Sequence, residues 1–356
     1  MGSVCTRQSA VAVLGDMETK AVPDDPDDDV RENGVEDEPQ ESVTLRLLLL
    51  GAAESGKTTL LEQIRMLYNQ EFSAMELFHR KSFIYANIVH SMNRMLAFMD
   101  RQNIEFENPA NKNNADLVKT RLENHYSPFN DEQYKALETL WKDASVQLAF
   151  ERRAEYNLND SAKYFFDGLP RINNVNFQPS PQDLIMTYVP TIGIQNVIFS
   201  AKNQSFQLFD MGGQKIDRRK WATMYDGIDA IFFCMAISEY DQMMIEDQST
   251  NRLQDSLDLL EKISCEPKFL TTPIFLFLNE TDVFAENLKR VPLAKYVTDY
   301  TGSSEKEALQ CIAAKAKEKC SKHQGNLYVY FTTAINRTEM AKTLDKVFKQ
   351  LLREIR

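Results

Sequence analysis

Residues 43–58 read VTLRLLLLGAAESGKT and divide into two parts with different physical meaning. The first part, up to Leu50, is an apolar run of strand length, which is typical of a strand buried on both faces of a parallel sheet. The second part, from Gly51 to Thr58, matches the pattern G-x-x-x-x-G-K-[ST] and is followed by helical spacing. Backbone N–H groups at such a turn point toward an anion. The stretch therefore predicts a phosphate-binding loop; a chance glycine-rich turn is the alternative.

The rest of the chain extends this strand into a sheet. Similar apolar runs occur at residues 206–209, 230–236, 274–278 and 327–331, separated by segments with helical spacing. This alternation predicts a doubly wound α/β sheet. The chain ends in a predicted amphipathic helix, whose apolar residues are Met340, Leu344, Val347, Phe348, Leu351, Leu352 and Ile355.

An all-helical insertion interrupts this pattern. Between about residues 72 and 178 the strand runs are missing and apolar residues recur at helical intervals. We therefore expect an inserted helical domain at 71–182, and a sheet domain made of residues 43–70 and 183–356. Residues 1–42 form a third segment of different composition.

Composition limits the classes of function. With 356 residues, of which 43% are hydrophobic, the chain can form a substantial core. The net charge of −11 comes mostly from residues 24–41, which hold ten acidic residues and one arginine. The remainder is almost neutral, which argues against nucleic-acid binding. The five cysteines and four histidines lack the spacing of a disulfide scaffold or a zinc site, so we expect reduced thiols inside the cell.

The N-terminus carries a possible lipidation signal. The first six residues fit M-G-x-x-x-[ST], which predicts myristoylation at Gly2, and Cys5 is available for palmitoylation. An ordinary disordered N-terminus is the alternative. The acidic, proline-broken segment up to residue 42 is expected to be a disordered tether. Because no apolar run approaches the length of a membrane span, we expect the chain to stay on the cytoplasmic side and to meet the membrane surface through its acyl chains.

Several residues are candidates for phosphate and metal chemistry. Lys57 is expected on the β and γ phosphates and the Thr58 hydroxyl on Mg²⁺. The stretch DMGGQ, residues 210–214, follows a predicted strand, where Asp210 can reach the metal through water. Gly213 can offer an unhindered N–H to a γ-phosphate, and Gln214 can orient an attacking water. A tight glycine turn with a capping aspartate is the alternative.

A second motif is a candidate for recognising the base of a bound nucleotide. Residues 279–282 read NETD and resemble the Asn-Lys-x-Asp motif of GTPases. The Asp282 carboxylate can accept from both N1–H and the 2-amino group of guanine, which adenine does not offer in that arrangement. A turn aspartate is the alternative for this residue. A P-loop ATPase or kinase would need an adenine site and an acceptor pocket, and the sequence indicates neither.

From about residue 43 to its end the sequence resembles heterotrimeric G-protein α subunits. The resemblance is carried by residues 47–51, 54–57, 140–143, 155–161, 182–183, 209–214, 219–221, 277–279 and 331–334. It implies a Ras-like doubly wound P-loop GTPase domain with an inserted all-helical domain that clasps the nucleotide. The implied ligands are GTP or GDP and Mg²⁺.

The resemblance also implies roles for particular residues. Thr191 would join Thr58 as a Mg²⁺ ligand, Ser161 would approach from the helical domain, and Ala334 would give its N–H to the guanine O6. Residues 212–214 would open switch II, to which 218–221 belong, with Gln214 as the catalytic residue. The full implied nucleotide-binding set is Gly51, Glu54, Ser55, Gly56, Lys57, Thr58, Thr59, Ser161, Leu184, Thr191, Asp210, Gly213, Asn279, Asp282 and Ala334.

The function implied by the resemblance is that of a signal transducer. The chain would act as a GTP/GDP switch downstream of G protein-coupled receptors, at the cytoplasmic face of the plasma membrane. Its implied partners are a βγ dimer, a receptor and an effector. The family's long N-terminal amphipathic helix is replaced here by the acidic tether, and the last helix is about six residues shorter than the family pattern, so the βγ and receptor contacts depend on altered ends.

Three substitutions depart from the family pattern near the chemistry. Tyr188 stands at the position of the family's catalytic arginine, which predicts slow hydrolysis because an arginine finger is worth about 10³ to 10⁵ in rate. Ala53 replaces a P-loop glycine, and Glu280 replaces the lysine of Asn-Lys-x-Asp. The alternative function is therefore a pseudo-GTPase that binds nucleotide as a scaffold or switch without turnover.

Overall fold

A computed structural model describes residues 43–122, 125–191, 193–244, 247 and 249–355. The predicted tether at 1–42 and the predicted acylation sites Gly2 and Cys5 lie outside these residues. Within the described ranges no helix is long and apolar enough to cross a membrane.

The centre of the molecule is a six-stranded sheet with the order β2-β3-β1-β4-β5-β6. The strands are β1 Leu45–Gly51, β2 Ile194–Ala201, β3 Gln204–Met211, β4 Ala230–Ala236, β5 Ile274–Asn279 and β6 Leu327–Thr332. All neighbours are parallel except β2 and β3. The predicted doubly wound α/β sheet is thus confirmed, and β2 is an additional antiparallel edge strand that the sequence reading missed.

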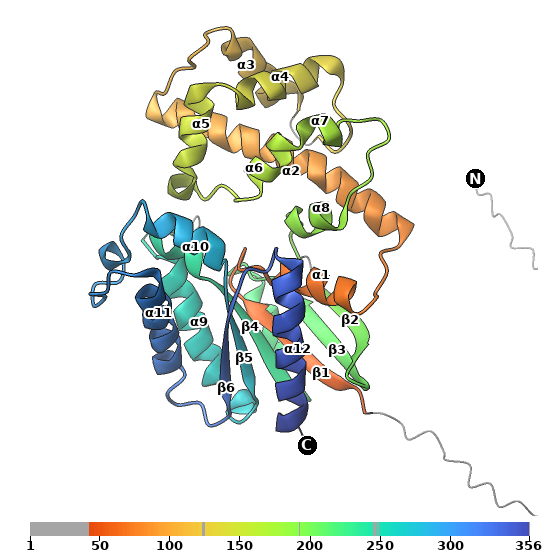
Figure 1. Cartoon of the computed structure of the whole chain (residues 1–356), viewed down its shortest axis with the longest axis vertical. Helices are drawn as coiled ribbons and strands as arrows, with labels where there is room; N and C mark the ends of the chain where they lie inside the picture. The colour runs from red at the N-terminus through yellow and green to blue at the C-terminus, as the bar shows by residue number, and fades with distance from the viewer. Residues whose placement is uncertain (1–42, 123–124, 192, 245–246, 248, 356) are drawn as a thin grey trace, which may run out of the picture. The chain divides into compact units, whose positions relative to one another are not determined.

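Helices cover both faces of this sheet, as Figure 1 shows. On one face α1, Lys57–Leu67, and α12, Arg337–Glu354, share a core with the strands. On the other face α9, Arg252–Ser264, and α11, Glu305–Lys319, pack beside α10, Thr281–Leu288. Layers on both faces explain why the central strands are continuous apolar runs rather than alternating ones.

The terminal helix largely follows its predicted pattern. Five of its predicted apolar residues are buried, namely Met340, Leu344, Val347, Phe348 and Leu351. Leu352 is half-buried. Ile355 was wrongly placed on the apolar face, because the helix ends at Glu354 and the Ile355 side chain remains 36% exposed.

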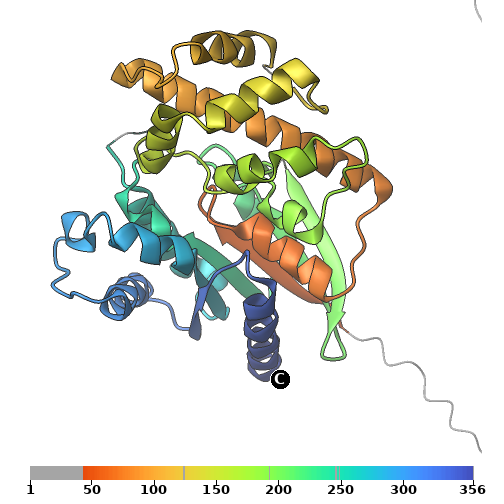
Figure 2. The same cartoon turned by 45° about the horizontal axis from the view of Figure 1, so that its top comes forward.

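The inserted segment is all-helical across its described residues, which confirms the prediction. Its helices are α2 Ala74–Gln102, α3 Asn111–Arg121, α4 Asp131–Trp141, α5 Ala144–Glu151, α6 Ala162–Asp167 and α7 Leu169–Ile172. The long helix α2 crosses this part from end to end (Figures 1 and 2). It begins with a capping box formed by Ser73 and Glu76, which satisfies backbone N–H groups of its first turn.

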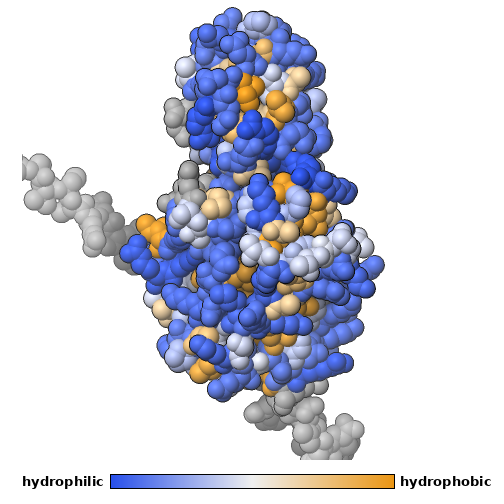
Figure 3. Space-filling model, turned by 90° about the vertical axis from the view of Figure 1, so that its left-hand side faces the viewer, coloured by the Kyte–Doolittle hydropathy of each residue, from blue (hydrophilic) through white to orange (hydrophobic). Residues whose placement is uncertain are grey.

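The helical part has a hydrophobic core of its own. Buried residues from Ile84 to Phe177 form one cluster, whereas the two clusters that flank the sheet take their buried residues from 45–64 and 199–351. Helix α8, Pro181–Met186, follows this segment and contains the expected boundary between residues 182 and 183. On the face seen in Figure 3 hydrophilic residues predominate. The helical part therefore has a core of its own, and the limits of the two domains stay a prediction.

Candidate functional site

A cavity of about 780 Å³ lies where the helical part faces the carboxyl ends of the strands. The sheet register places the ends of β1, β3, β4 and β5 along one edge, since Leu49 pairs with Asp210, Gly51 with Cys234, and Ala236 with Asn279. Ligands of open α/β sheets bind outside this edge. The position of the cavity is therefore the one that the topology favours.

Most residues predicted for the site line this cavity. They are Glu54, Ser55, Gly56, Lys57, Thr58, Thr59, Ser161, Leu184, Thr191, Gly213, Gln214, Asn279, Asp282 and Ala334. The two exceptions are Gly51, at the end of β1, and Asp210, which is fully buried behind the threonines. Six separate stretches of the sequence, at 54–59, 161, 184–191, 213–214, 279–282 and 334, therefore meet at one place.

Two glycines, one in the loop after β1 and one in the loop after β3, are packed too closely to accept side chains. Gly56 caps α1 at a φ of 88°, and a Cβ there would lie 2.1 Å from Asn279 Nδ2. A Cβ on Gly213 would lie 2.5 Å from Lys57 Nζ and 2.6 Å from the Ala52 carbonyl oxygen. Both positions need glycine because neighbouring segments approach the backbone itself.

Lys57 carries a buried cation at the entrance of α1. Lys57 is only 5% exposed, and its Nζ donates to the Ala52 carbonyl at 2.6 Å. Burial lowers the pKa of Lys57, while the nearby Asp210 carboxylate opposes that shift. A buried ammonium group is costly unless anions surround it, so this position is suited to a phosphate.

Three oxygen atoms converge beside Lys57 in a way that fits Mg²⁺. The Thr58 and Thr191 Oγ1 atoms are 3.1 Å apart, and Thr191 Oγ1 donates to Asp210 Oδ2 at 3.1 Å. Burial raises the pKa of Asp210, and its Oδ1 has no hydrogen-bond partner among the described residues. Hydroxyl and carboxylate oxygens are the ligands that Mg²⁺ prefers, and a cation would compensate the buried carboxylate.

At the other end of the cavity Asn279 connects three loops. Its Nδ2 donates to the Ser55 carbonyl at 3.3 Å, and its Oδ1 accepts from Thr332 Oγ1 at 3.1 Å and from the Ala334 N–H at 3.0 Å. Because the Ala334 N–H is directed at Asn279, its donation to the guanine O6 stays a prediction. Partial burial raises the pKa of Asp282, which lies in the first turn of α10.

The three substituted positions all line the cavity. Burial, followed by the Glu54 carboxylate, raises the pKa of the Tyr188 phenol, so Tyr188 lies close to the P-loop. Ser238 Oγ donates to Glu280 Oε2, and burial, together with Glu239, raises the pKa of Glu280 well above its ordinary value. The Ala53 carbonyl accepts from Arg252 Nη2 at 3.1 Å.

Arg252 is a functional candidate that the sequence reading missed. Its side chain is 9% exposed and bridges Glu54 Oε2 at 2.9 Å and Glu239 Oε1 at 2.5 Å. It thereby fixes the P-loop against α9. Nothing in the sequence marks it, because an arginine at the first position of an amphipathic helix usually lies on the surface.

Other cavity residues also escaped the sequence reading. They are mainly charged and include Arg80, Arg153, Asp160, Lys163, Lys289 and Arg290. Asp160 accepts from Arg153 Nε at 2.6 Å. Asp160 directly precedes the predicted Ser161 and lies in the stretch 155–161 that carries the family resemblance, and both signals could have identified it.

The fold and the site define a P-loop nucleotide-binding protein of the Ras-like α/β class with an all-helical insertion. Comparison with known proteins specifies the family. A family model described as G-protein alpha subunit matches residues 21–351, and the chain belongs to this family.

Individual relatives agree with the family model. The chain is 52% identical over 313 residues to the guanine nucleotide-binding protein alpha-13 subunit of Caenorhabditis briggsae. The matched region covers 88% of this chain and 90% of that relative. For the alpha-13 subunit of Caenorhabditis elegans the identity is 52% over 308 residues, and the match covers 86% of this chain and 88% of that relative. The G(o) subunit alpha of Locusta migratoria is 38% identical over 322 residues, with 89% and 91% covered.

As a member of this family, the chain is a signal transducer of the G-protein alpha class. Proteins of the family are GTPases, bind GTP or GDP with Mg²⁺, associate peripherally with membranes, and work with βγ dimers, receptors and effectors. Nothing in the comparisons favours the alternative of a pseudo-GTPase.

Proposed function

We propose that this chain binds GTP and GDP with Mg²⁺ in the cavity between its two parts and hydrolyses GTP slowly. The observation that carries the proposal is the convergence of Thr58, Thr191 and Asp210 oxygens beside the buried Lys57. Such a combination of a fixed cation and an oxygen site suits a metal-bound triphosphate.

Both walls of the cavity take part in holding the nucleotide. On the sheet side the P-loop, including Gly51, Glu54 and Ser55, surrounds the phosphates, and Thr59 continues into α1. On the opposite side Ser161 and Leu184 line the same space and restrict the escape of the ligand.

The base is read at the end formed by β5 and β6. The Asp282 carboxylate accepts the two neighbouring guanine donors, and Asn279 keeps the P-loop and the loop after β6 together. Glu280 brings an acid where the family has a lysine, so we expect weaker retention of the nucleotide without loss of the guanine preference.

Mg²⁺, when bound, neutralises negative charge on the β and γ phosphates. Thr58 and Thr191 would hold it directly, and Asp210 would hold it through water. Gln214 is an exposed residue at the cavity wall and is suited to orienting the attacking water. Tyr188 supplies no cation for the developing charge, which is why we propose slow turnover.

The cellular setting follows from the family and the N-terminal signal. We propose acylation at Gly2 and Cys5, with the chain held at the cytoplasmic face of the plasma membrane. There it would exchange nucleotide under the control of a G protein-coupled receptor, bind a βγ dimer and act on an effector. We also propose that residues 43–70 and 183–356 form the Ras-like sheet domain and that residues 71–182 form the inserted helical domain.

The proposal is tested by nucleotide competition and single-turnover hydrolysis on the purified chain. GTP should displace a fluorescent guanine nucleotide at a concentration at least about 10²-fold lower than ATP, since a site built to bond the guanine edge rejects adenine. Gln214→Leu should keep this binding and abolish phosphate release. Equal displacement by ATP would refute the base assignment, and undetectable phosphate release from the wild-type chain would support a pseudo-GTPase.

The methyl group of Ala53 provides a second prediction. Ala53→Gly should raise the single-turnover rate by about three- to tenfold, roughly 1 kcal/mol, because the methyl lies where the loop passes the γ-phosphate and Gln214. The matched control is Ala52→Gly, since Ala52 precedes it but does not line the cavity. An equal change in both variants would mean that backbone flexibility, not the methyl, controls the rate.

A further inference from the structure

The loop that joins α8 to β2 is attached at two points to different parts of the molecule. At residue 191 it reaches the oxygen cluster, where Thr191 Oγ1 donates to Asp210 Oδ2 at 3.1 Å. At residue 188 it is held by Asn87 of α2, in the helical part. Asn87 Nδ2 donates to the Tyr188 carbonyl at 3.0 Å, and the Tyr188 N–H donates to Asn87 Oδ1 at 2.8 Å.

Only a carboxamide can make this pair of contacts in that place. The N–H and the C=O of one residue require one acceptor and one donor, and the Asn87 amide supplies both. A carboxylate of the same shape would face the Tyr188 carbonyl with a second acceptor. Because both hydrogen bonds of Asn87 go to the backbone of residue 188, they do not require a particular side chain there.

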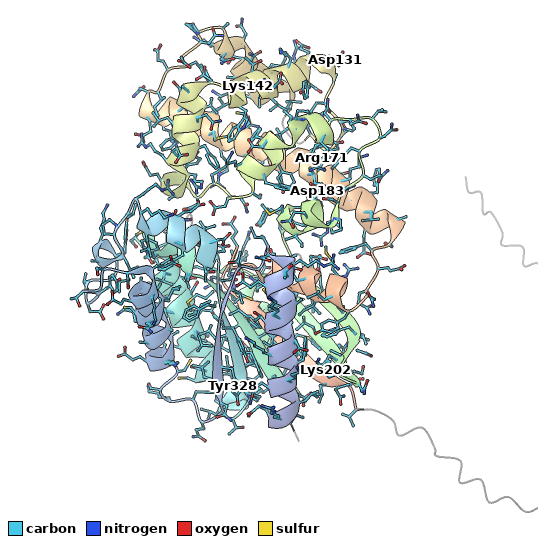
Figure 4. The ribbon with its side chains drawn as sticks, viewed as in Figure 1. Asp131, Lys142, Arg171, Asp183, Lys202 and Tyr328 are labelled. Carbon is cyan, nitrogen blue, oxygen red and sulfur yellow. The ribbon has the colours of Figure 1, made fainter. Side chains whose placement is uncertain are left out.

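Helix α8 is also bound to the helical part, which makes the attachment continuous. The Asp183 carboxylate accepts from Arg171 Nη2 at 2.7 Å and Nη1 at 2.8 Å, and from the Tyr164 hydroxyl at 2.9 Å. Arg171 and Asp183 are labelled in Figure 4, where they lie next to each other between α7 and α8. The Asn87 contact extends this attachment to residue 188, beyond the end of α8.

The remaining distance along the chain is short. From residue 188 to residue 191 there are three steps, and a fully extended chain spans at most about 3.3 to 3.6 Å per step. At most about 10 Å of chain therefore separates the Asn87 contacts from the contacts of Thr191 with Thr58 and Asp210, so a short segment connects the position of α2 to that of Thr191.

We propose that Asn87 is a positioning residue that sets the place of Thr191 and so controls how firmly Mg²⁺ and the nucleotide triphosphate are retained. This inference rests on the proposed function. The competing explanation is that Asn87 only keeps the two parts closed. Two other contacts do that without touching the loop, from Asn157 Nδ2 to the Met243 carbonyl at 2.9 Å and from Arg290 Nη1 to the Glu151 carbonyl at 2.8 Å.

Asn157 therefore offers a matched control. It is the same residue type, lies in the helical part, and donates one hydrogen bond to Met243 of the sheet part. Since its φ is 53°, Asn157→Gly removes the side chain without strain, whereas alanine would be strained there. Asn87 lies inside α2, where Asn87→Ala keeps the helix intact.

The experiment measures dissociation of a fluorescent GTPγS analogue from the purified full chain across a series of Mg²⁺ concentrations and in EDTA. Asn87→Ala should speed dissociation by about tenfold at saturating Mg²⁺, the loss expected for two hydrogen bonds. It should also raise the Mg²⁺ concentration needed for half-maximal retention, and the difference from wild type should vanish in EDTA. Asn157→Gly should speed dissociation by the same factor at saturating Mg²⁺ and in EDTA.

The inference is overturned if the Asn87→Ala factor is the same with Mg²⁺ and in EDTA, which is the result for simple closure. It is also overturned if the effects of Asn87→Ala and Thr191→Ala add in the double variant, because residues that act through one another are not additive. Asn87→Asp, with the same shape, repeats the test if the alanine variant fails to fold. Failure of the wild-type chain to bind GTPγS would instead refute the proposed function.

Discussion

Tyr188→Arg is expected to raise the single-turnover rate of GTP hydrolysis by at least about 10²-fold. Position 188 lines the cavity, and its backbone is already held by Asn87, so the introduced guanidinium would enter a site with fixed geometry. The expected gain lies below the full worth of an arginine finger because Glu54 is close to position 188 and would compete for the new cation. The measurement is phosphate release from a preformed complex with GTP after addition of Mg²⁺.

Two further variants identify the cause of any increase. Tyr188→Phe keeps the ring and adds no charge, so its rate should remain at the wild-type level. Adding Gln214→Leu to Tyr188→Arg should abolish the gain, because water would no longer be oriented. If Tyr188→Arg leaves the rate unchanged, the missing positive charge is not the cause of slow hydrolysis. The departures from the family pattern at Ala53 and Glu280 then become the better explanations of the slow rate.

The second large effect is expected at the base. Asp282→Asn should weaken GTP binding by about 10³-fold or more, since the amide would face the guanine N1–H and 2-amino group with a donor in place of an acceptor. Xanthine carries an oxygen at position 2, so the variant should gain affinity for xanthosine triphosphate. Competition of both nucleotides against a fluorescent guanine analogue measures the two changes together.

Glu286→Gln is the matched control for this change. Glu286 is an acid on the same helix, one turn further along, and it also lines the cavity. Its substitution should leave the ratio of guanine to xanthine affinity unchanged. A similar loss of GTP binding in both variants would mean that net charge at the cavity, and not the pairing of Asp282 with the base, determines affinity.

Most of the strands that the sequence predicts are buried, and the exception is β6, which is predicted although it is a half-buried edge strand. β1, β4 and β5 lie between two helical layers, so their apolar residues form uninterrupted runs. β2 is different because it lies at the antiparallel edge of the sheet. Its residues Ile194 and Ile198 are 43% and 57% exposed, and two polar residues and one valine stand between them. This eight-residue edge strand therefore shows neither a continuous apolar run nor a strict alternation of apolar and polar residues.

The residues of the candidate site likewise divide into those that the sequence could predict and those that it could not. Residues in motifs directly after strands, such as Lys57, Asp210 and Asn279, could be placed together because parallel strands end at one edge. Asn87 and Arg252 could not, since each contacts a partner 101 and 198 residues away from within an ordinary helical pattern. Their importance comes from tertiary packing, which single-sequence patterns do not encode.

The core of the helical part is built from residues 84–177 alone, whereas the two cores at the sheet take their residues from 45–64 and 199–351, and this separation along the chain has a thermodynamic consequence. Two regions that are packed separately can unfold separately, so a single transition is not guaranteed for the ligand-free chain. A nucleotide held by both walls binds only when both regions are folded, and it stabilises each through mass action. By the proposed function, such a ligand would act as a reversible cross-link, and the cooperativity of unfolding would itself depend on nucleotide concentration.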